Sequence, residues 1–557
     1  MKQKNTTLLL ALFLLGIFMG AIDTGIVSPA RELIQNSFGV DRSVGTWMIT
    51  LYTLVYAISM PIVSKMADKY GYKKVYIFGI ATFGIGSLFC GLANFYGTFA
   101  FFLLARAIQA IGAGGIMPIA NAVIGNSFPE EKRGTALGMV GMIYGVGNIL
   151  GPTLGSSIID IAGSDHWGWI FFINVPISIA IILLSASMEN TTAAVQKPMD
   201  LPGSVVLAGV IGSLMYALTN LDFFHFADSI KTTEVYPFLL SFAILTPVLL
   251  FVEKRAKDPI LNIKYFKDRQ MLMILIISFI VGIGMMGMVF VPQFSENVLK
   301  IKAGSGGYLV TLLAVFSGIA APFSGKLIDK KGARFVLALG FLFTVTGALF
   351  LGYVTTKSLT FISVFIGLAL MGLGVGFTMG APLNYLVLQT VPKEESASGL
   401  ATMSLVRSIG LAISPSVMIG FIVDAAKGLQ PKLMETLQTG LAASMPKGMS
   451  IPTAASGGGN AEAFKALQNA DVTTIVDMLK EAVGSVVPAQ AKPMIGKAID
   501  SISDAIVTTF QSVMNTGYTH MYVAAAIIAA CGFVAALLLR KKDVGISADT
   551  VNHSMGE

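Results

Sequence analysis

The sequence predicts an all-α polytopic membrane protein, and three observations lead to that prediction. Of its 557 residues, 54% are hydrophobic and only 12% are charged, and the mean hydropathy is +0.74. A soluble domain has about a quarter of its residues charged, so a soluble enzyme is nearly excluded. The chain also contains fourteen apolar runs that are long enough to span a bilayer. The same short motifs occur in its first half and again in its second half.

The apolar runs form a group of six, a middle pair and a second group of six. Each has roughly 20 mostly apolar residues, the length of a bilayer-spanning helix. The first run follows Lys2 and Lys4 as a signal peptide would. It continues to Asp23 without a convincing cleavage site, so we interpret it as an uncleaved helix. The predicted spans cover about 6–29, 44–64, 74–94, 98–122, 134–160, 168–188, 201–220, 235–253, 270–294, 304–328, 333–354, 359–386, 397–424 and 518–540.

The net charge of +7 is best explained by membrane topology. Basic residues gather in the loops at 65–74, 254–269 and 326–334, and again at 540–542 after the last span. With fourteen spans, all four clusters lie on one side of the membrane, and the positive-inside rule makes that side the cytoplasm. We therefore predict a multi-pass protein of the cytoplasmic (inner) membrane with both termini in the cytoplasm and no nucleic-acid partner.

An internal repeat divides the chain into two similar halves. Asp68 and Gly71 follow the second span, and Asp329 and Gly332 follow the tenth span 261 residues later. Two six-helix units related by duplication are typical of transporters that rock around a central cavity; a duplicated structural bundle is the alternative. The predicted units are 1–190 (N-terminal half), 191–269 (linker with two spans), 270–424 (first five helices of the C-terminal half), 425–517 (extracytoplasmic insert) and 518–557 (last span and cytoplasmic tail).

Three ionisable residues fall well inside predicted spans, away from the span ends, where a charge costs several kcal/mol unless it is paired or hydrated. Asp23 lies two-thirds along the first span and is the candidate proton carrier; the alternative is a structural Asp near the outer surface. Arg106, in the fourth span, is its candidate electrostatic partner, or it only satisfies backbone carbonyls. Arg407, in span thirteen, is a candidate site for an anionic group, or a partner for polar groups of its own half.

Small residues repeat at helical spacing along the fifth span. Gly147, Gly151 and Gly155 lie four residues apart, and Pro152 stands among them. Small residues let two helices approach closely, and neighbouring helices can satisfy the carbonyl that a proline frees. We predict a helix-packing face here, and such a close seam can also serve as a gate.

Together these motifs resemble the major facilitator superfamily, and specifically its fourteen-span drug–proton antiporter subfamily. The loop that carries Asp68, Gly71 and Lys73 resembles the superfamily's Gly-x-x-x-Asp-x-x-Gly-Arg-Arg motif. The stretch from Arg106 to Gln109 is similar to the fourth-span Arg-x-x-Gln motif that is associated with proton coupling. The resemblance implies the major facilitator fold, as two six-helix halves with two linker helices between them.

The resemblance also covers the first and fifth spans and suggests functional residues. The surroundings of Asp23 resemble the Leu-Asp-x-Thr-Ile-Val signature of fourteen-span members, and the Gly-Pro pair at 151–152 resembles their fifth-span motif. An Asp near a helix end beside basic residues can change partners between two states. The predicted gating residues are Asp68, Gly71, Lys73, Asp329, Gly332 and Arg334. The predicted substrate-cavity residues are Gln109, Asn148, Asn384 and Arg407.

The energy source predicted from the sequence is an ion gradient. No Gly-x-x-x-x-Gly-Lys-Ser/Thr stretch occurs, so we expect no ATP-driven pump and no cofactor. Cys90 and Cys531 both lie in apolar runs, so we expect neither a disulfide framework nor a metal site.

Residues 425–517 form a predicted insert between the last two spans. Its seven Lys balance its seven Asp and Glu, and a glycine-rich break lies at 456–460. Apolar residues keep helical spacing on both sides of the break: Leu429, Leu433, Leu437 and Leu441 before it, and Ile475, Met478, Leu479 and Ala482 after it. We expect a small helical cap or amphipathic helices at the membrane surface. The cap either shapes an exit path for the substrate or is a packed decoration.

We therefore predict a secondary transporter that uses the proton gradient to export a hydrophobic or amphipathic small molecule, either a drug or antibiotic, with antibiotic resistance as a consequence, or a lipid-like compound. The alternative is an importer or facilitator of a nutrient or vitamin on the same scaffold. A membrane-embedded transferase or a lipid-scaffolding protein is a second alternative, but an enzyme needs clustered catalytic residues and the four histidines are scattered. We expect a monomer whose partners are the substrate and the lipid bilayer.

Overall fold

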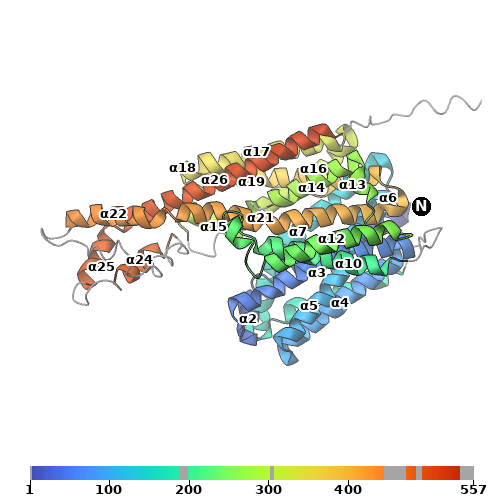
Figure 1. The fold of residues 1–557 in the computed structure, drawn as a ribbon, viewed down its shortest axis with the longest axis horizontal. Helices are drawn as coiled ribbons and strands as arrows, with labels where there is room; N and C mark the ends of the chain where they lie inside the picture. Colours follow the sequence, from blue (N-terminus) through green and yellow to red (C-terminus); the bar gives the residue numbers. More distant parts are fainter. Residues whose placement is uncertain are drawn as a thin grey trace, which may run out of the picture.

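The computed structural model describes residues 3–186, 199–285, 287–301, 307–444, 472–484 and 492–539, and every regular element in these ranges is a helix (Figure 1). The N-terminal half contains α1 (Gln3–Ile26), α2 (Arg31–Phe38), α3 (Arg42–Tyr70), α4 (Tyr72–Tyr96), α5 (Phe99–Gly114), α6 (Ile116–Ser127), α7 (Glu130–Ala162), η1 (Ser164–His166), α8 (Trp169–Phe172) and α9 (Asn174–Ser185).

A linker with two long helices separates this half from the C-terminal half. The linker contains α10 (Leu201–Asn220), α11 (Phe226–Ser229), α12 (Tyr236–Arg255) and α13 (Lys264–Lys267). The C-terminal half contains α14 (Arg269–Gly284), α15 (Gly287–Leu299), α16 (Gly307–Lys331), α17 (Ala333–Leu349) with η2 (Phe350–Thr355) and α18 (Thr356–Ser358), α19 (Phe361–Thr378), α20 (Ala381–Thr390), η3 (Lys393–Glu395), α21 (Ser396–Ala426) and α26 (Ser503–Leu538). The insert contains α22 (Leu429–Ser444), α24 (Ile475–Gly484) and α25 (Lys492–Ser501).

Within the described ranges, twelve helical segments are long and apolar enough to cross a membrane. The other two predicted spans coincide with shorter apolar helices at Trp169–Ser185 and Arg269–Gly284. The multi-pass character of the chain is therefore confirmed. The count of fourteen spans stays a prediction.

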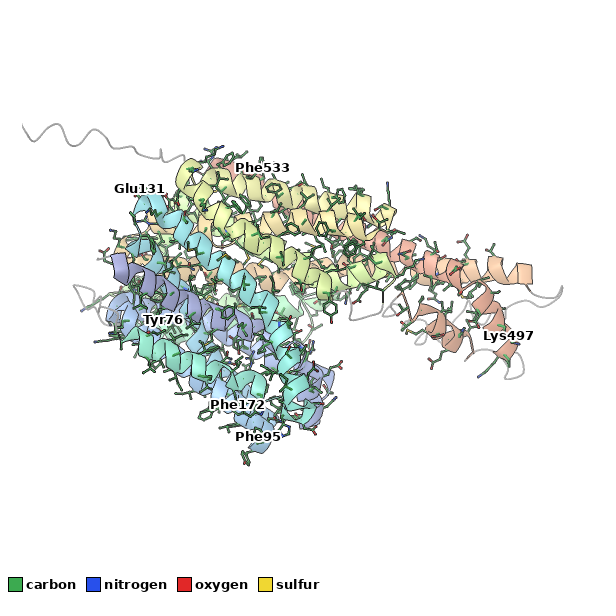
Figure 2. All side chains as sticks on the ribbon, turned by 180° about the vertical axis from the view of Figure 1, so that it is seen from behind. Tyr76, Phe95, Glu131, Phe172, Lys497 and Phe533 are labelled. Carbon is green, nitrogen blue, oxygen red and sulfur yellow. The ribbon has the colours of Figure 1, made fainter. Side chains whose placement is uncertain are left out.

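The two halves lie side by side and splay apart toward one end of the molecule (Figures 1 and 2). We call the end where they meet the basic end, because it carries residues 65–74 and 326–334. The other end, which carries α22, α24 and α25, is the insert end. The N-terminus lies at the basic end (Figure 1).

Helix α7 contacts both halves through its glycines. A Cβ atom on Gly151 would lie 2.8 Å from the carbonyl oxygen of Ile22 on α1, and one on Gly155 would lie 2.5 Å from that of Ile26. On the α16 side, a Cβ on Gly138 would lie 2.8 Å from the carbonyl oxygen of Ala321. Because these positions have no side chain, α7 approaches α1 and α16 closely at once, as small residues at helical spacing allow.

The apolar core is continuous from one half to the other near the basic end. Leu137 and Val140 of α7 belong to the same buried cluster as Leu383 and Val387 of α20. Side chains fill the spaces between the helices throughout both halves, as Figure 2 shows around Tyr76. This core holds the halves together at the end opposite to the splayed one.

The insert forms helices, as the spacing of its apolar residues predicts. Leu429, Leu433 and Leu437 of α22 and Ile475 and Leu479 of α24 are buried in one cluster with the first turns of α26. Helix α26 begins at Ser503 and not near residue 518, so the last helix extends well beyond the predicted span. The side chain of Leu441 and the break at 456–460 lie outside what the structure describes.

Candidate functional site

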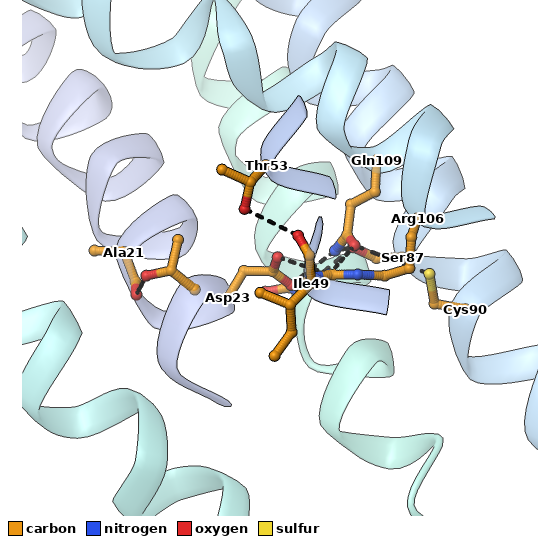
Figure 3. A network of polar contacts seen from close by, with 10 residues as sticks. Ala21, Asp23, Ile49, Thr53, Ser87, Cys90, Arg106 and Gln109 are labelled. Atoms are coloured by element: carbon orange, nitrogen blue, oxygen red, sulfur yellow. Dashed lines mark hydrogen bonds and ion pairs between the residues drawn. The ribbon is translucent and has the colours of Figure 1, made fainter. Parts of the chain in front are cut away.

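The centre of the N-terminal half holds a buried carboxylate with three donors. Asp23 on α1 has no exposed surface. It accepts hydrogen bonds from Arg106 Nη1 at 3.2 Å and from Gln109 Nε2 at 2.7 Å (Figure 3). It also accepts one from Asn174 Nδ2 at 3.0 Å. The Arg106 contact is also an ion pair, with both side chains at least 97% buried. We call these four residues the Asp23 network.

Further contacts hold Gln109 and Arg106, two of the donors of the Asp23 network, in place. Gln109 also donates to Ser87 Oγ at 2.7 Å and accepts from Arg106 Nη1 at 2.5 Å. The Arg106 guanidinium lies 4.0 Å from the centre of the Tyr52 ring and 5.6 Å from that of Phe171, which are cation–π distances. The arginine therefore points at Asp23 with little freedom to turn away.

Local sequence explains how the donors reach Asp23. Arg106 and Gln109 lie one turn apart on α5, so their side chains share a face of that helix. A Cβ on Gly86 of α4 would lie 2.5 Å from the Cα atom of Gln109, and Gly79 and Gly112 form a similar close contact between the same helices. The absence of side chains at these glycines lets α5 pack closely enough on α4 to project both polar side chains toward α1.

At the basic end, Asp68 binds the start of a helix in the other half. Asp68 lies at the end of α3, and its carboxylate accepts from the backbone N–H groups of Ala397 at 3.1 Å and Ser398 at 2.7 Å. It also accepts from Ser398 Oγ at 2.6 Å and from the Tyr72 hydroxyl at 2.9 Å. A carboxylate at a helix N-terminus satisfies free N–H groups and interacts favourably with the helix dipole.

Asp329 makes the same contact in the opposite direction. It lies at the end of α16, and its carboxylate accepts from the N–H groups of Gly134 at 2.7 Å and Thr135 at 2.9 Å, at the start of α7. It also accepts from Thr135 Oγ1 at 2.6 Å. The receiving pairs Gly134-Thr135 and Ala397-Ser398 are 263 residues apart, in keeping with the internal repeat. We call these two contacts the reciprocal latches.

Gly71 and Gly332 form the turns that follow the two latch residues. Their φ angles are +96° and +83°, which residues with a side chain adopt only with strain. Lys73, just after the first turn, donates to the carbonyl oxygen of Ala186 at 2.9 Å. Arg334 lies half-buried in the first turn of α17. The predicted gating residues therefore all lie at the basic end, and their gating role stays a prediction.

A narrow cavity of about 50 Å³ lies between the halves. The N-terminal half contributes Met117, Gly141, Tyr144, Gly145 and Asn148, and the C-terminal half contributes Met285, Ala314, Ser317, Ala321, Val375, Gly376, Met379, Gly380 and Arg407. Asn148 accepts a hydrogen bond from Thr24 Oγ1 at 3.0 Å, one position after Asp23. This bond joins the cavity wall to α1, the helix that carries Asp23, but no residue of the Asp23 network is among the lining residues.

Two of the four predicted cavity residues line this cavity, and two do not. Asn148 and Arg407 are in its wall. Gln109 belongs instead to the Asp23 network, because its amide bonds Asp23 and Ser87. Asn384 is buried in α20 and is not among the lining residues, so its role in substrate binding stays a prediction.

Sequence reasoning missed three members of the site. Asn174, Ser87 and Tyr52 come from three different helices, and none belongs to a motif. Asn174 gives the strongest signal of the three, since it is an amide within the otherwise apolar stretch Trp-Ile-Phe-Phe-Ile-Asn-Val-Pro. In the part of the chain that the structure describes, no group of three or more His, Cys, Asp or Glu side chains is arranged to bind a metal.

Comparison with known proteins identifies one family and several similar transporters. Residues 13–415 match the family model of the Major Facilitator Superfamily. The uncharacterized MFS-type transporter YfiU of Bacillus subtilis is 35% identical over 533 residues, or 95% of each chain. The multidrug transporter protein MdtP of the same organism is 30% identical over 443 residues, or 79% of each chain. The riboflavin transporter RibZ of Clostridioides difficile is 26% identical, with 76% of this chain and 90% of RibZ covered.

Among solved structures, the proton:xylose symporter XylE has the same fold. The TM-score is 0.53 at 14% identity, and the match covers 75% of this chain and 88% of XylE. At that identity the likeness shows the fold alone.

Proposed function

Because the chain belongs to the Major Facilitator Superfamily, a family of membrane transporters, we propose that it is a proton-coupled exporter of hydrophobic or amphipathic small molecules. In this proposal it belongs to the fourteen-span drug–proton antiporter subfamily and resides in the cytoplasmic membrane as a monomer. The basic end faces the cytoplasm, as the excess of basic residues in cytoplasmic loops requires. The proton gradient supplies the energy, and no cofactor takes part.

The observation that carries the proposal is the Asp23 network, whose carboxylate lies on the same helix as Thr24, a contact of the cavity wall. An ionised carboxylate only accepts hydrogen bonds, and Asp23 faces three donors. A proton on Asp23 turns one oxygen into a donor and removes the negative charge that Arg106 pairs with. The network therefore fits one protonation state and is destabilised by the other. Such a difference is what couples proton binding to a change of shape.

The reciprocal latches supply the element with two states. Each half presents one carboxylate to a helix start in the other half, and these contacts exist only while the basic end is closed. Rocking of the halves separates both carboxylates from the N–H groups together. In the proposed cycle, a proton moves through Asp23 while the cavity opens first to one side and then to the other.

The substrate class and the direction of transport are proposed from relatives. MdtP is a multidrug transporter, and the chain matches it over 79% of both lengths. RibZ, a riboflavin transporter, supports the alternative that this scaffold moves a vitamin or nutrient instead. Both alternatives use the same central cavity and differ in whether compound and proton move in opposite directions.

The test uses purified protein in proteoliposomes with a pH dye inside and an imposed proton gradient. Lipophilic cations, antibiotics, lipids and flavins are added in turn to wild type and to Asp23→Asn. We expect at least one compound to cause proton movement in wild type and none to do so in Asp23→Asn, because an amide cannot exchange a proton at this position.

The matched control is Asp160→Asn, which removes an exposed carboxylate at the end of α7 in the same half. It should behave as wild type. If a compound crosses without proton movement, and equally fast in Asp23→Asn, then proton coupling is wrong and the facilitator alternative takes its place.

A further inference from the structure

We propose that the central cavity binds an amphipathic organic anion whose acid group pairs with Arg407. This inference rests on the proposed transport function and assigns a charge to its substrate. It starts from Arg407, a buried cation that the Asp23 network does not include.

Arg407 is buried and faces no carboxylate. The residue is 8% exposed, and among the described residues its guanidinium makes one long hydrogen bond, 3.5 Å from Nη2 to Ser404 Oγ. Among the described residues, no Asp or Glu forms an ion pair with it. The titratable side chains near it are Tyr144 and Tyr56. A guanidinium offers five N–H donors, so most of its capacity is unused.

The free capacity of Arg407 is directed at the cavity. Arg407 lines its wall together with Tyr144, Asn148 and Ser317, and none of these four side chains is acidic. A buried charge without a partner is unfavourable, and a planar carboxylate, sulfonate or phosphate satisfies a guanidinium with two parallel hydrogen bonds. A bound anion is therefore the partner that the protein itself does not supply.

The rest of the wall is apolar and adaptable. Met117 of α6, Met285 just after α14 and Met379 just after α19 line it, beside Val375 and small residues. Methionine is flexible and polarizable, so it accommodates apolar bodies of different shape. One cationic group in a methionine-rich wall matches a ligand with one acid group and an apolar body.

The cavity is too small for such a ligand in the state that the structure describes. Its volume of about 50 Å³ holds a few water molecules, whereas sites for drug-sized ligands measure about 300–1,000 Å³. Both halves contribute walls, so the cavity widens when the halves separate. The anion therefore binds in a more open state than the one described, and its binding favours that state.

Tyr52 and Tyr56 connect this site to the Asp23 network. Their rings lie one turn apart on α3 and stack, with centroids 6.2 Å apart and planes 6° from parallel. Tyr52 covers Arg106, and Tyr56 lies near Arg407. A shift of α3 on loss of the latch at Asp68 thus moves both rings, and with them the surroundings of both arginines.

The test uses three dansyl probes that share one ring system and differ in charge. Dansylglycine is an anion, its methyl ester is neutral, and dansylcadaverine is a cation. Equilibrium binding is measured by fluorescence on full-length protein in phosphatidylcholine nanodiscs, without a proton gradient. We expect dansylglycine to bind at least about tenfold more tightly than the ester, as a charge-assisted hydrogen bond to a buried partner gives.

Two variants and a control assign that preference to Arg407. Arg407→Gln should lose about tenfold or more in dansylglycine affinity and leave the ester unchanged, whereas Arg407→Lys should keep most of it. Arg255→Gln, which removes an exposed guanidinium beside Phe251, should match wild type. Arg407→Gln should also melt at the same or a higher temperature, because it removes an uncompensated buried charge; a purely structural arginine predicts a lower melting temperature.

Addition of phosphatidylglycerol to the nanodiscs separates two sources of the anion. If phosphatidylglycerol competes with dansylglycine for wild type, the site exists and its natural ligand is an anionic lipid. If phosphatidylglycerol does not compete, the natural ligand is a soluble anionic amphiphile. The proposal is overturned if dansylcadaverine or the ester binds as well as dansylglycine, if Arg407→Gln weakens all probes equally, or if dansylglycine does not bind at millimolar concentration. Because no gradient is used, the result is independent of whether Asp23 carries protons.

Discussion

Arg106 and Arg407 are both almost fully buried, at 3% and 8% exposed, but only Arg106 faces a carboxylate. In the N-terminal half, the cation is held by Asp23, by Gln109 and by the ring of Tyr52. In the C-terminal half, the cation has one long contact to Ser404 and otherwise faces the cavity. Among the described residues, the buried arginine of the N-terminal half therefore has its counter-charge within the protein, whereas that of the C-terminal half has none, which is why we propose an external anion for it.

Removal of the carboxylate that pairs with Arg106 should lower the stability of the protein more than any other change proposed here. Asp23→Ala leaves Arg106 buried without a counter-charge, and removal of one partner from a buried ion pair costs about 3–5 kcal/mol. We expect the free energy of unfolding in detergent micelles, from SDS titration, to fall by roughly that amount.

The double variant Asp23→Ala with Arg106→Met should recover much of the loss, since no charge is then left unpaired. Arg407→Met alone should leave stability unchanged or raise it. If Asp23→Ala and Arg407→Met are equally destabilising, the two arginines do not differ in the way their contacts indicate.

At the reciprocal latches, unlike at the two arginines, the two halves make the same kind of contact. Asp68→Asn and Asp329→Asn each weaken the contact to a helix start, which costs about 1–2 kcal/mol. The population with the basic end open should rise by a factor of roughly 5–30 in either variant.

The opening is measured by labelling a cysteine that Ser317→Cys places in the cavity wall. The exposed Cys531 is first removed by Cys531→Ala, whereas Cys90 is fully buried and is kept. A membrane-impermeant thiol reagent is applied from the side of the basic end, and its labelling rate should rise equally in both latch variants. Asp258→Asn is the control, because Asp258 pairs with Lys65 at 2.7 Å and joins α3 to the linker, not one half to the other. A strong rise in only one latch variant would show that the latches are not equivalent.

The smallest effect is expected from the two stacked tyrosines. Tyr56→Phe removes a hydroxyl near Arg407 and should change dansylglycine affinity by about 1 kcal/mol or less, with no effect on stability. Tyr52→Phe removes the hydroxyl beside Asp23 and should instead change the pH dependence of transport. The comparison fails here if Tyr56→Phe affects the proton response and Tyr52→Phe affects anion binding.

The sequence was sufficient to predict the parts of the site that carry charge. A lone Asp or Arg in an apolar run must find a partner or water, so Asp23 and Arg106 were recognisable and their proximity was foreseeable from their common half. The glycines of α7 were recognisable for a similar reason, because few other causes place small residues four apart in a span.

The neutral members of the site could not be predicted in the same way. A Ser or Tyr in a membrane span is often satisfied by its own helix, as Ser185 is by Ile181, so Ser87 and Tyr52 had no distinguishing mark. Gln109 was assigned to the cavity because the sequence does not say which way its face of α5 turns. The early start of α26 was also hidden, because residues 503–517 mix polar and apolar positions and only packing against α22 and α24 decides their structure.

The long last helix has a practical consequence for observing this protein at work. Helix α26 runs unbroken from Ser503 to Leu538, so the fifteen residues before position 518 form a rod of about 22 Å that continues the C-terminal half. The insert lobe, made of the described helices α22, α24 and α25 at its tip, is joined to that half through α21 and α26 (Figure 1). It thus acts as a lever arm and as an asymmetric marker for electron microscopy. Spin labels on α22 and on α2 should report each rocking step as a larger change in distance than labels within the bundle.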